Sequence, residues 1–369
     1  MGGRQSAVGN PVSSLADFYR GKKVLVTGHT GFKGGWLATW LRLMGAEVTG
    51  FALPAETEPN LFSAAEVADG IVSTFGDIRD LDAVKEVFAR RIPDIVIHNA
   101  AQALVRRSYR EPVETYATNV MGTVHVLEAV RATPSVRSVV VVTSDKCYEN
   151  REWERGYEES DAMGGHDPYS SSKGAAELVT AAYRRSFFNL ERSAAVATAR
   201  AGNVIGGGDW SEDRLIPDIV RGISADVPIK IRRPDSVRPW QHVLEPLSGY
   251  LLLAKKVYED GSEFADAWNF GPRTEDSITT ADLADRVRAI WGKGDLQIQA
   301  DPSAPHEATF LRLNCAKASQ RLGWRPRLGL AQAVEWTVDW YRAFYERSSV
   351  SPRETTERQI RAYMETSAS

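Results

Sequence analysis

The sequence predicts an α/β protein, with a Rossmann-type doubly wound parallel sheet and a smaller, irregular C-terminal substrate-binding domain. Three observations support this prediction. Between residues 21 and 200, short β-branched apolar runs alternate with longer amphipathic runs, as in stacked βαβ units. A glycine-rich turn follows the first of these runs. After Asn203 the alternation gives way to charged segments that proline and glycine punctuate.

The expected strands are apolar with little alternation, because helices cover both faces of such a sheet. Six runs fit this description: 22–27, 47–53, 71–75, 95–99, 138–143 and 195–200. Amphipathic periodicity predicts helices between them at 32–43, 81–90, 113–132 and 169–188, and later helices at 243–260, 278–291 and 330–345.

Composition excludes several classes of protein. With 369 residues, 43% hydrophobic and 25% charged, the chain has the composition of a globular protein. Its net charge of −3 gives no broad positive field for nucleic acid or an anionic membrane. We expect no membrane-spanning segment and a cytoplasmic location, because no apolar run is long enough and the two cysteines, Cys147 and Cys315, form no disulfide framework. No metal-ligand spacing is present, so we assign no metal.

The glycine-rich turn lies between the first strand and the first helix, and it reads Gly28-His29-Thr30-Gly31-Phe32-Lys33-Gly34. Its G-x-x-G-x-x-G spacing permits a tight turn, close approach to a pyrophosphate and close helix packing, and the helix N-terminus favours an anion. This context predicts a dinucleotide site, with a purely structural turn as the alternative. His29 and Lys33 are expected to add bulk and charge close to the pyrophosphate.

The adenosine end of this site is less defined by the sequence. The second strand ends without an acidic residue for the ribose, and Glu56 is the nearest candidate. No arginine stands there for a 2′-phosphate either. Asp77, just after the third strand, is a candidate acceptor for the adenine amino group, and a helix N-cap is its alternative role.

Two groups of residues suggest proton-transfer chemistry. Tyr169 and Lys173 lie four residues apart on one helix face, where the ammonium group would favour the phenolate. Ser144, Asp145 and Lys146 follow the fifth strand, at the sheet edge where α/β proteins bind ligands. Asp145 is a candidate acid, and Lys146 is a candidate base if it is desolvated. A chance pair and a surface turn are the respective alternatives.

The chain resembles the extended short-chain dehydrogenase/reductase family. The resemblance rests on the glycine loop, Asn119, the Tyr169–Lys173 pair and His98-x-Ala100-Ala101. Within the family, four strings are similar to those of nucleotide-sugar 4,6-dehydratases, in the branch that acts on CDP-glucose: 29–34, 143–148, 200–210 and 238–243. Other dehydratases of the family carry Thr-Asp-Glu where this chain has Ser144, Asp145 and Lys146.

The resemblance implies an internal redox reaction on CDP-glucose with NAD. Tyr169, aided by Ser144, would deprotonate the 4-hydroxyl while hydride passes to NAD. Lys146 would then remove the proton on carbon 5, Asp145 would protonate the departing 6-hydroxyl, and hydride would return to carbon 6. The implied product is CDP-4-keto-6-deoxyglucose; the deoxysugar pathway beyond it, such as one leading to an O-antigen, is left open by the sequence.

The resemblance also implies binding roles. The NAD site would comprise the loop residues Gly28, His29, Gly31, Phe32, Lys33 and Gly34, with Asp77, Ile78, Ala100 and Lys173, which holds the nicotinamide ribose. The substrate site would comprise Asn203, Arg214, Arg232 and Arg238, with guanidinium groups on phosphate. Alternatives remain open for Asn203 as a turn-forming amide and for Arg238 as a surface ion-pair partner.

These roles give a division of the chain. We expect an NAD-binding Rossmann domain over 21–202, rejoined by 238–270, a sugar-nucleotide-binding domain over 203–237 and 271–345, and flexible ends over 1–20 and 346–369. The resemblance further implies a homodimer through a four-helix bundle. A 4-epimerase, a dehydratase of another nucleotide sugar, and a nucleotide-sensing protein without chemistry are the competing hypotheses.

Overall fold

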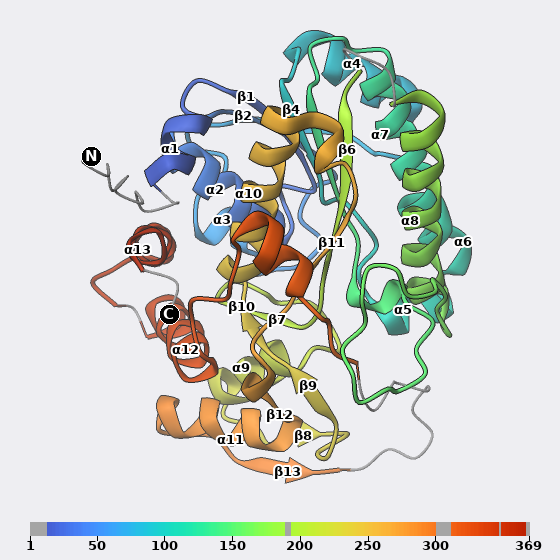
Figure 1. The fold of residues 1–369 in the computed structure, drawn as a ribbon. Coiled ribbons are helices and arrows are strands. Elements are labelled where there is room, and N and C mark those ends of the chain that lie inside the picture. Colours follow the sequence, from blue (N-terminus) through green and yellow to red (C-terminus); the bar gives the residue numbers. More distant parts are fainter. Residues whose placement is uncertain (1–12, 189–192, 300–310, 347, 367–369) are drawn as a thin grey trace, which may run out of the picture.

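The structure is a computed structural model that describes residues 13–188, 193–299, 311–346 and 348–366. Its centre is a parallel seven-stranded sheet with the order β11-β6-β5-β4-β1-β2-β3 (Figure 1). The strands are β1 (Lys23–Thr27), β2 (Glu47–Ala52), β3 (Val72–Phe75), β4 (Ile95–His98), β5 (Ser138–Val142), β6 (Ala195–Ala201) and β11 (Ala267–Phe270). The predicted fold class and the six predicted strands are confirmed.

Helices cover both faces of the sheet, and strand residues alternate between two cores. One core contains Val24 and Val26 with the helices α2 (Phe32–Leu43) and α10 (Leu244–Asp260). The other contains Leu25 with the helices α4 (Leu81–Arg91), α7 (Gly122–Arg131) and α8 (Pro168–Phe187). Figure 1 shows α2 and α10 on one side of the strands and α4, α7 and α8 on the other. The lack of alternation in the sequence therefore has its expected cause.

Two elements of the sheet region differ from the prediction. The seventh strand, β11, was not predicted because the four residues Ala267–Phe270 form a strand only through pairing with β6, far away in sequence. The expected helix over 113–132 instead consists of α6 (Pro112–Tyr116), a π-helical turn (Ala117–Met121) and α7, and the short helix α5 (Val105–Arg110) precedes it. Asn119 lies in this π turn, a feature that often marks functional sites.

The remaining elements form an irregular region below the carboxyl ends of the sheet strands (Figure 1). Three two-stranded pairs occur there: β7 (Val204–Ile205) with β10 (Gln241–His242), β8 (Ile229–Ile231) with β13 (Leu296–Ile298), and β9 (Val237–Pro239) with β12 (Ser277–Thr279). The principal helices are α9 (Leu215–Ala225), α11 (Thr280–Trp291) and α12 (Leu330–Tyr345). The short helix α3 (Leu61–Ala64) packs against α2.

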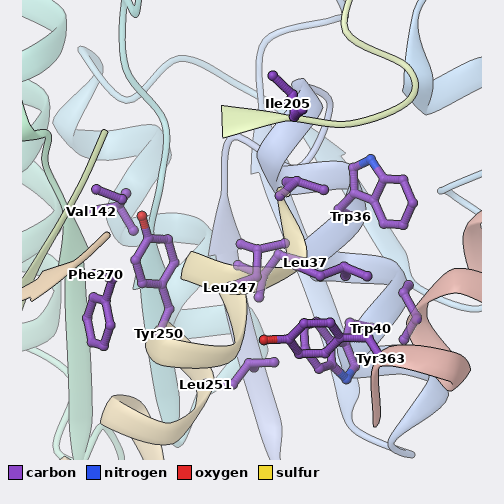
Figure 2. Close-up of a cluster of buried hydrophobic side chains, with 14 of the residues drawn as sticks. Trp36, Leu37, Trp40, Val142, Ile205, Leu247, Tyr250, Leu251, Phe270 and Tyr363 are labelled. Atoms are coloured by element: carbon purple, nitrogen blue, oxygen red, sulfur yellow. The ribbon is translucent and has the colours of Figure 1, made fainter. Parts of the chain in front are cut away.

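The C-terminal segment is ordered, so the expectation of a flexible end over 346–369 is wrong for most of that stretch. Helix α13 (Pro352–Glu365) begins with a capping box between Ser351 and Glu354. It buries Ile360 and Tyr363 completely. The tyrosine ring packs edge-on against Trp40 of α2 at 5.4 Å between centroids, as Figure 2 shows. Because the segment is polar in composition, this apolar contact was not predicted from the sequence.

The N-terminal expectation is corrected in the same way for part of its range. Helix α1 (Ser13–Tyr19) packs on α10 with Leu15 and Tyr19 buried, and the Tyr19 hydroxyl donates to the carbonyl of Leu251 at 2.8 Å. Residues 1–12 lie outside the described residues. Among the helices that are described, none combines the length and apolar character needed to cross a membrane.

Glu245 joins three segments inside the core. It lies in the first turn of α10 and is fully buried. Its carboxylate accepts hydrogen bonds from the amides of Arg327 and Leu328 and from the hydroxyl of Tyr363. Burial raises the pKa of Glu245 to about 7, while these hydrogen bonds oppose the rise. The charged form is therefore disfavoured in the folded state.

This raised pKa predicts a pH-dependent stability. A carboxyl group whose folded pKa exceeds its usual value of 4.5 contributes stability that is lost as pH rises through about 7. The loss is at most about 3 kcal/mol, at about 1.4 kcal/mol per pKa unit. Glu245→Gln keeps an acceptor and a donor but cannot ionise. Thermal unfolding at pH 5 and pH 8 should show a larger fall in Tm for the wild type than for this variant; parallel falls would contradict the prediction.

Candidate active site

A cavity of about 560 Å³ opens at the carboxyl ends of β1, β4, β5 and β6, and we call it the cleft. The glycine loop lines one end of it. Ser144, Asp145, Lys146, Tyr169 and Lys173 line its middle, and arginines from the irregular region line the other end. The structure thus brings together nearly all the residues that the sequence analysis selected.

Two glycines of the loop, Gly28 and Gly34, leave room only for backbone. Gly28 has a φ of +79°, and a Cβ atom there would lie 2.8 Å from the backbone of Ala100. A Cβ atom at Gly34 would lie 1.9 Å from the carbonyl oxygen of Gly28. Gly31 caps α2 without a side-chain hydrogen bond, and the first turn of α2 has no acidic residue. This backbone cradle at an uncapped helix N-terminus fits the pyrophosphate of a dinucleotide.

His29 does not contact the cleft with its side chain, contrary to the expectation from the sequence. The ring is fully buried behind the loop, where it fills the space over Gly50 of β2, and its Nε2 is hydrogen-bonded to the Ser73 hydroxyl at 2.7 Å. Burial lowers the pKa of His29 to about 4, so the ring is neutral. It therefore adds neither bulk nor charge beside a pyrophosphate.

Lys33 extends to the middle of the cleft. Its ammonium lies 5.9 Å from the centroid of the Tyr250 ring. Burial lowers the pKa of Lys33 to about 8; Arg214 and Lys173 lower it further, and Asp145 opposes them. The positive charge that was expected at the pyrophosphate is thus placed among the residues that follow β5.

The adenosine end carries two carboxylates that are already paired. Asp77 accepts hydrogen bonds from the backbone and side chain of Arg79, and these hold the pKa of Asp77 below its usual value. Glu56 is paired with Arg107 of α5 at 3.0 Å. Asp77 and Glu56 both line the cleft, as do Ile78 and Ala100. A ribose or adenine group bound here would share its carboxylate with an arginine that is already paired to it.

A tight turn after β5 presents three side chains. Ser144 donates to Asp145 at 2.9 Å and accepts from the amide of Lys146 at 3.2 Å. Asp145 is buried, and burial raises its pKa, although Lys146, Ser144, Lys33 and Arg238 oppose the rise. Gly202 leaves the space that the Asp145 carboxylate occupies, since a Cβ atom there would lie 2.6 Å from the carboxylate. Burial thus shifts Asp145 toward the protonated form that an acid needs.

Lys146 does not meet the desolvation condition under which it was predicted to act as a base. Its action as a base was made to depend on desolvation, yet the side chain is only partly buried. Its place in the cleft beside Asp145 is nevertheless the predicted one.

Tyr169 and Lys173 project from the first turns of α8, which begins at the N-cap Asp167. The ammonium of Lys173 donates to the carbonyl of Val142 at 3.3 Å. Burial lowers the pKa of Lys173 to about 8, opposed by Cys147 and Glu177. Burial raises the pKa of Tyr169 to about 12, against the effect of the Ser144 hydroxyl. The predicted face of the helix therefore meets the turn after β5.

Four residues expected at the substrate end all line the cleft: Asn203, Arg214, Arg232 and Arg238. Arg214 is paired with the buried Asp209 at 2.9 Å. Arg232 is paired with Asp213 at 2.6 Å and with Asp218 at 3.1 Å. These ion pairs fix the direction of the guanidinium groups and leave further donors for an anion.

Comparison with known proteins identifies the family. The model described as GDP-mannose 4,6 dehydratase matches residues 25–337. The CDP-glucose 4,6-dehydratase of Salmonella typhimurium is 52% identical over 89% of this chain and 92% of its own length. A dTDP-glucose 4,6-dehydratase of Streptomyces antibioticus is 30% identical over 75% of this chain and 78% of its own. The chain belongs to the GDP-mannose 4,6 dehydratase family. Its predicted membership of the extended short-chain dehydrogenase/reductases is confirmed.

Solved structures agree with this assignment. The crystal structure of dTDP-glucose 4,6-dehydratase from Streptomyces venezuelae, with NAD bound, matches with a TM-score of 0.74 and 25% identity over 88% of this chain and 99% of that one. The UDP-glucose 4-epimerase of Brucella ovis shares the fold, with a TM-score of 0.73 and 22% identity over 86% of this chain and 97% of that chain.

Two features in and beside the cleft were not predicted from the sequence. Arg106 of α5 lines the cleft and lies 3.7 Å from Asp213, across from the arginines of the irregular region. Its signal in the sequence was the arginine pair that follows the fourth strand. Asn119 was predicted only as part of a motif. Its side-chain amide is hydrogen-bonded to the backbone of Gln102 and to the Ser172 hydroxyl, and the bond to Ser172 joins the π turn to α8.

Proposed function

We propose that the protein is a CDP-glucose 4,6-dehydratase that uses NAD and yields CDP-4-keto-6-deoxy-D-glucose. The observation that carries the proposal is the 52% identity to a CDP-glucose 4,6-dehydratase over 89% of the chain. The cleft supports it, because an acid, two lysines and a tyrosine lie together at the carboxyl edge of the sheet.

NAD fits the cleft through the backbone cradle of the glycine loop. Gly28, Gly31 and Gly34 would admit the pyrophosphate, Asp77 and Ile78 would face the adenine, and Lys173 would hold the nicotinamide ribose. When bound, NAD supplies the acceptor for hydride from carbon 4 of the hexose and the donor that returns it to carbon 6.

The first proton transfer is assigned to Tyr169. Its phenolate would take the proton of the 4-hydroxyl, with the Ser144 hydroxyl turned from Asp145 to donate to the same oxygen. Burial opposes ionisation of the phenol, and the Ser144 hydroxyl and the Arg214 guanidinium favour it. Tyr169 is therefore suited to act only while those donors are in place.

Elimination is assigned to the turn after β5. Asp145 would protonate the leaving 6-hydroxyl, and burial, which raises its pKa, makes the protonated form easier to reach. Lys146 would remove the proton on carbon 5, which the 4-ketone acidifies. Asn203, Arg214, Arg232 and Arg238 would hold the diphosphate, each arginine with a planar pair of donors.

A 4-epimerase is the competing reaction, because the Brucella ovis epimerase shares this fold. An epimerase needs the tyrosine and a bound intermediate that can rotate in the site, but it needs no acid beside carbon 6. The buried Asp145, whose pKa burial raises, therefore favours elimination.

We also propose that the chain divides as the sequence suggested, with 21–202 and 238–270 holding NAD and 203–237 and 271–345 holding the sugar nucleotide. The pairing of β11 with β6 supports the return of the chain to the first part. A cytoplasmic location is proposed because both cysteines are free thiols, as in reducing compartments.

A homodimer through a four-helix bundle is proposed from one apolar face. Six exposed apolar side chains come from α5, α6, the π turn and α8: Tyr109, Val113, Tyr116, Met121, Leu178 and Phe187. Val113 is 82% exposed and Leu178 is 60% exposed. Helices α6 and α8 pack beside each other, so a twofold axis would bring four helices together.

Nucleotide and reaction can be tested together. The protein is incubated with NAD and, separately, with CDP-, dTDP-, GDP- and UDP-glucose. Mass spectrometry should show a loss of about 18 mass units, one water, from CDP-glucose alone. Loss from a different nucleotide sugar would move the proposal to that substrate, and epimerisation without loss would reject elimination.

Substitution of the two assigned bases should stop the reaction at different steps. Lys146→Ala should still form reduced cofactor from bound substrate but lower the release of water by about 10²-fold or more. Tyr169→Phe should prevent reduction of the cofactor itself. Absorbance of the reduced nicotinamide separates the two variants from each other. Normal formation of the 4-keto-6-deoxy product by Lys146→Ala would assign the second proton transfer to another residue.

The dimer has its own test. Val113→Asp with Leu178→Asp should give a species of 40.7 kDa in sedimentation at micromolar concentration, while the wild type sediments as a dimer. Ile298→Asp is the matched control, because Ile298 is 70% exposed on β13, at the opposite end of the molecule from α8 (Figure 1). A monomeric wild type would reject the proposal.

A further inference from the structure

Glu177 lies behind the cleft and outside every role assigned so far. It follows Lys173 by one helical turn and Tyr169 by two, so the three side chains share a face of α8. The residue is buried with 4% of its surface exposed. Its carboxylate accepts from Thr143 at 2.5 Å, from Thr198 at 2.7 Å and from both Nε and Nη2 of Arg200.

Arg200 extends these contacts to the loop after the catalytic turn. Its Nη1 donates to the hydroxyl of Tyr148 at 2.6 Å and to the carbonyl of Glu159 at 3.2 Å. The Glu177–Arg200 pair is therefore buried with all its main donors and acceptors used. Because a buried ion pair is weak grounds for stability, its presence calls for another explanation.

The two threonines bind opposite oxygens of the same carboxylate. Thr143 bonds Oε1 and Thr198 bonds Oε2, and both threonines are buried, Thr143 directly after β5 and Thr198 in β6. Their positions along the strands differ. Thr143 directly precedes Ser144 and the catalytic turn, whereas Thr198 lies in the middle of β6.

We propose that Glu177 is a positioning residue, which sets the Ser144 hydroxyl against the Tyr169 phenol by holding Thr143 to α8. The carboxylate joins the helix that carries Tyr169 and Lys173 to the strand end that carries Ser144, Asp145 and Lys146. This inference rests on the proposed function, since it specifies how the first proton transfer is aligned.

The alignment has an electrostatic consequence. Burial raises the pKa of Tyr169 to about 12, and the Ser144 hydroxyl opposes that rise. If Ser144 moves away, the phenolate loses a donor and the pKa of Tyr169 rises further. Ground-state binding of a nucleotide sugar depends on other groups, so the loss falls on kcat rather than on KM.

Thr143→Val and Thr198→Val form a matched pair. Each replaces one buried hydroxyl on Glu177 with a methyl group of similar size. The Thr143 hydroxyl has one further contact, with the carbonyl of Ala199 at 3.4 Å, and Thr143→Ser keeps a hydroxyl for it. We expect Thr143→Val to lower kcat about tenfold, a fraction of the total effect of a general base, with KM within twofold. The limb of its pH profile that requires phenolate should move to higher pH. Thr198→Val should keep kcat within twofold, and Thr143→Ser should restore it.

A second measurement does not need turnover. The tyrosinate absorbance that is present in each protein and absent from its Tyr169→Phe derivative reports the ionised fraction of Tyr169 at about pH 12, near the pKa of that phenol. It should be smaller in Thr143→Val than in the wild type and unchanged in Thr198→Val.

The outcomes separate this inference from the proposed function. Equal kcat in the two valine variants, with equal tyrosinate, would overturn the positioning role while wild-type water loss from CDP-glucose upholds the function. A wild type inactive on every nucleotide sugar would reject the function, and the tyrosinate comparison alone would then decide the role of Glu177. Failure of Thr143→Ser to restore kcat would also overturn the inference.

Discussion

The closeness of α2 to the end of β1 is the constraint on which the rest of the structure depends. No side chain fits at Gly34, because the carbonyl of Gly28 occupies its place, and none fits at Gly28, because the backbone of Ala100 does. The helix therefore begins directly at the strand end, with its free N–H groups facing the cleft. The same approach turns Trp36 and Trp40 into the core, where α10 and α13 pack against them (Figure 2).

Burial then determines the chemistry of the cleft. It shifts the pKa values of Asp145, Tyr169 and Lys173 each toward the neutral form. For an acid such as Asp145 this is an advantage, since the protonated form becomes easier to populate. For Tyr169 it is a cost, which only nearby donors and cations offset. The cleft therefore functions as one electrostatic unit, in which the charge of Lys33 is coupled to Arg214, Lys173 and Asp145.

The parts of the molecule that the sequence predicted are those encoded by local spacing. The glycine loop, the Tyr169–Lys173 pair and the strand ends needed only periodicity and the geometry of parallel sheets. The parts it missed depend on distant partners. Strand β11 requires β6, α13 requires the ring of Trp40, and the His29 side chain turns away from the cleft because Gly50 leaves space behind the loop. The sequence pattern of one segment does not indicate such distant partners.

Glu177 combines the two cases, because its position on the helix follows from local spacing but its burial and its partners do not. Its spacing from Tyr169 and Lys173 places it on the same helix face, but a helix face alone cannot distinguish a solvent-exposed acid from a buried one. The difference comes from Arg200 and two threonines on neighbouring strands, which supply enough donors to keep a carboxylate charged inside the protein. Reliable alignment of a helix with a strand end requires directional contacts, and apolar packing, which has no preferred direction, does not supply them. A charged network is therefore located where the two catalytic segments meet, at the point in the sheet where small displacements matter most.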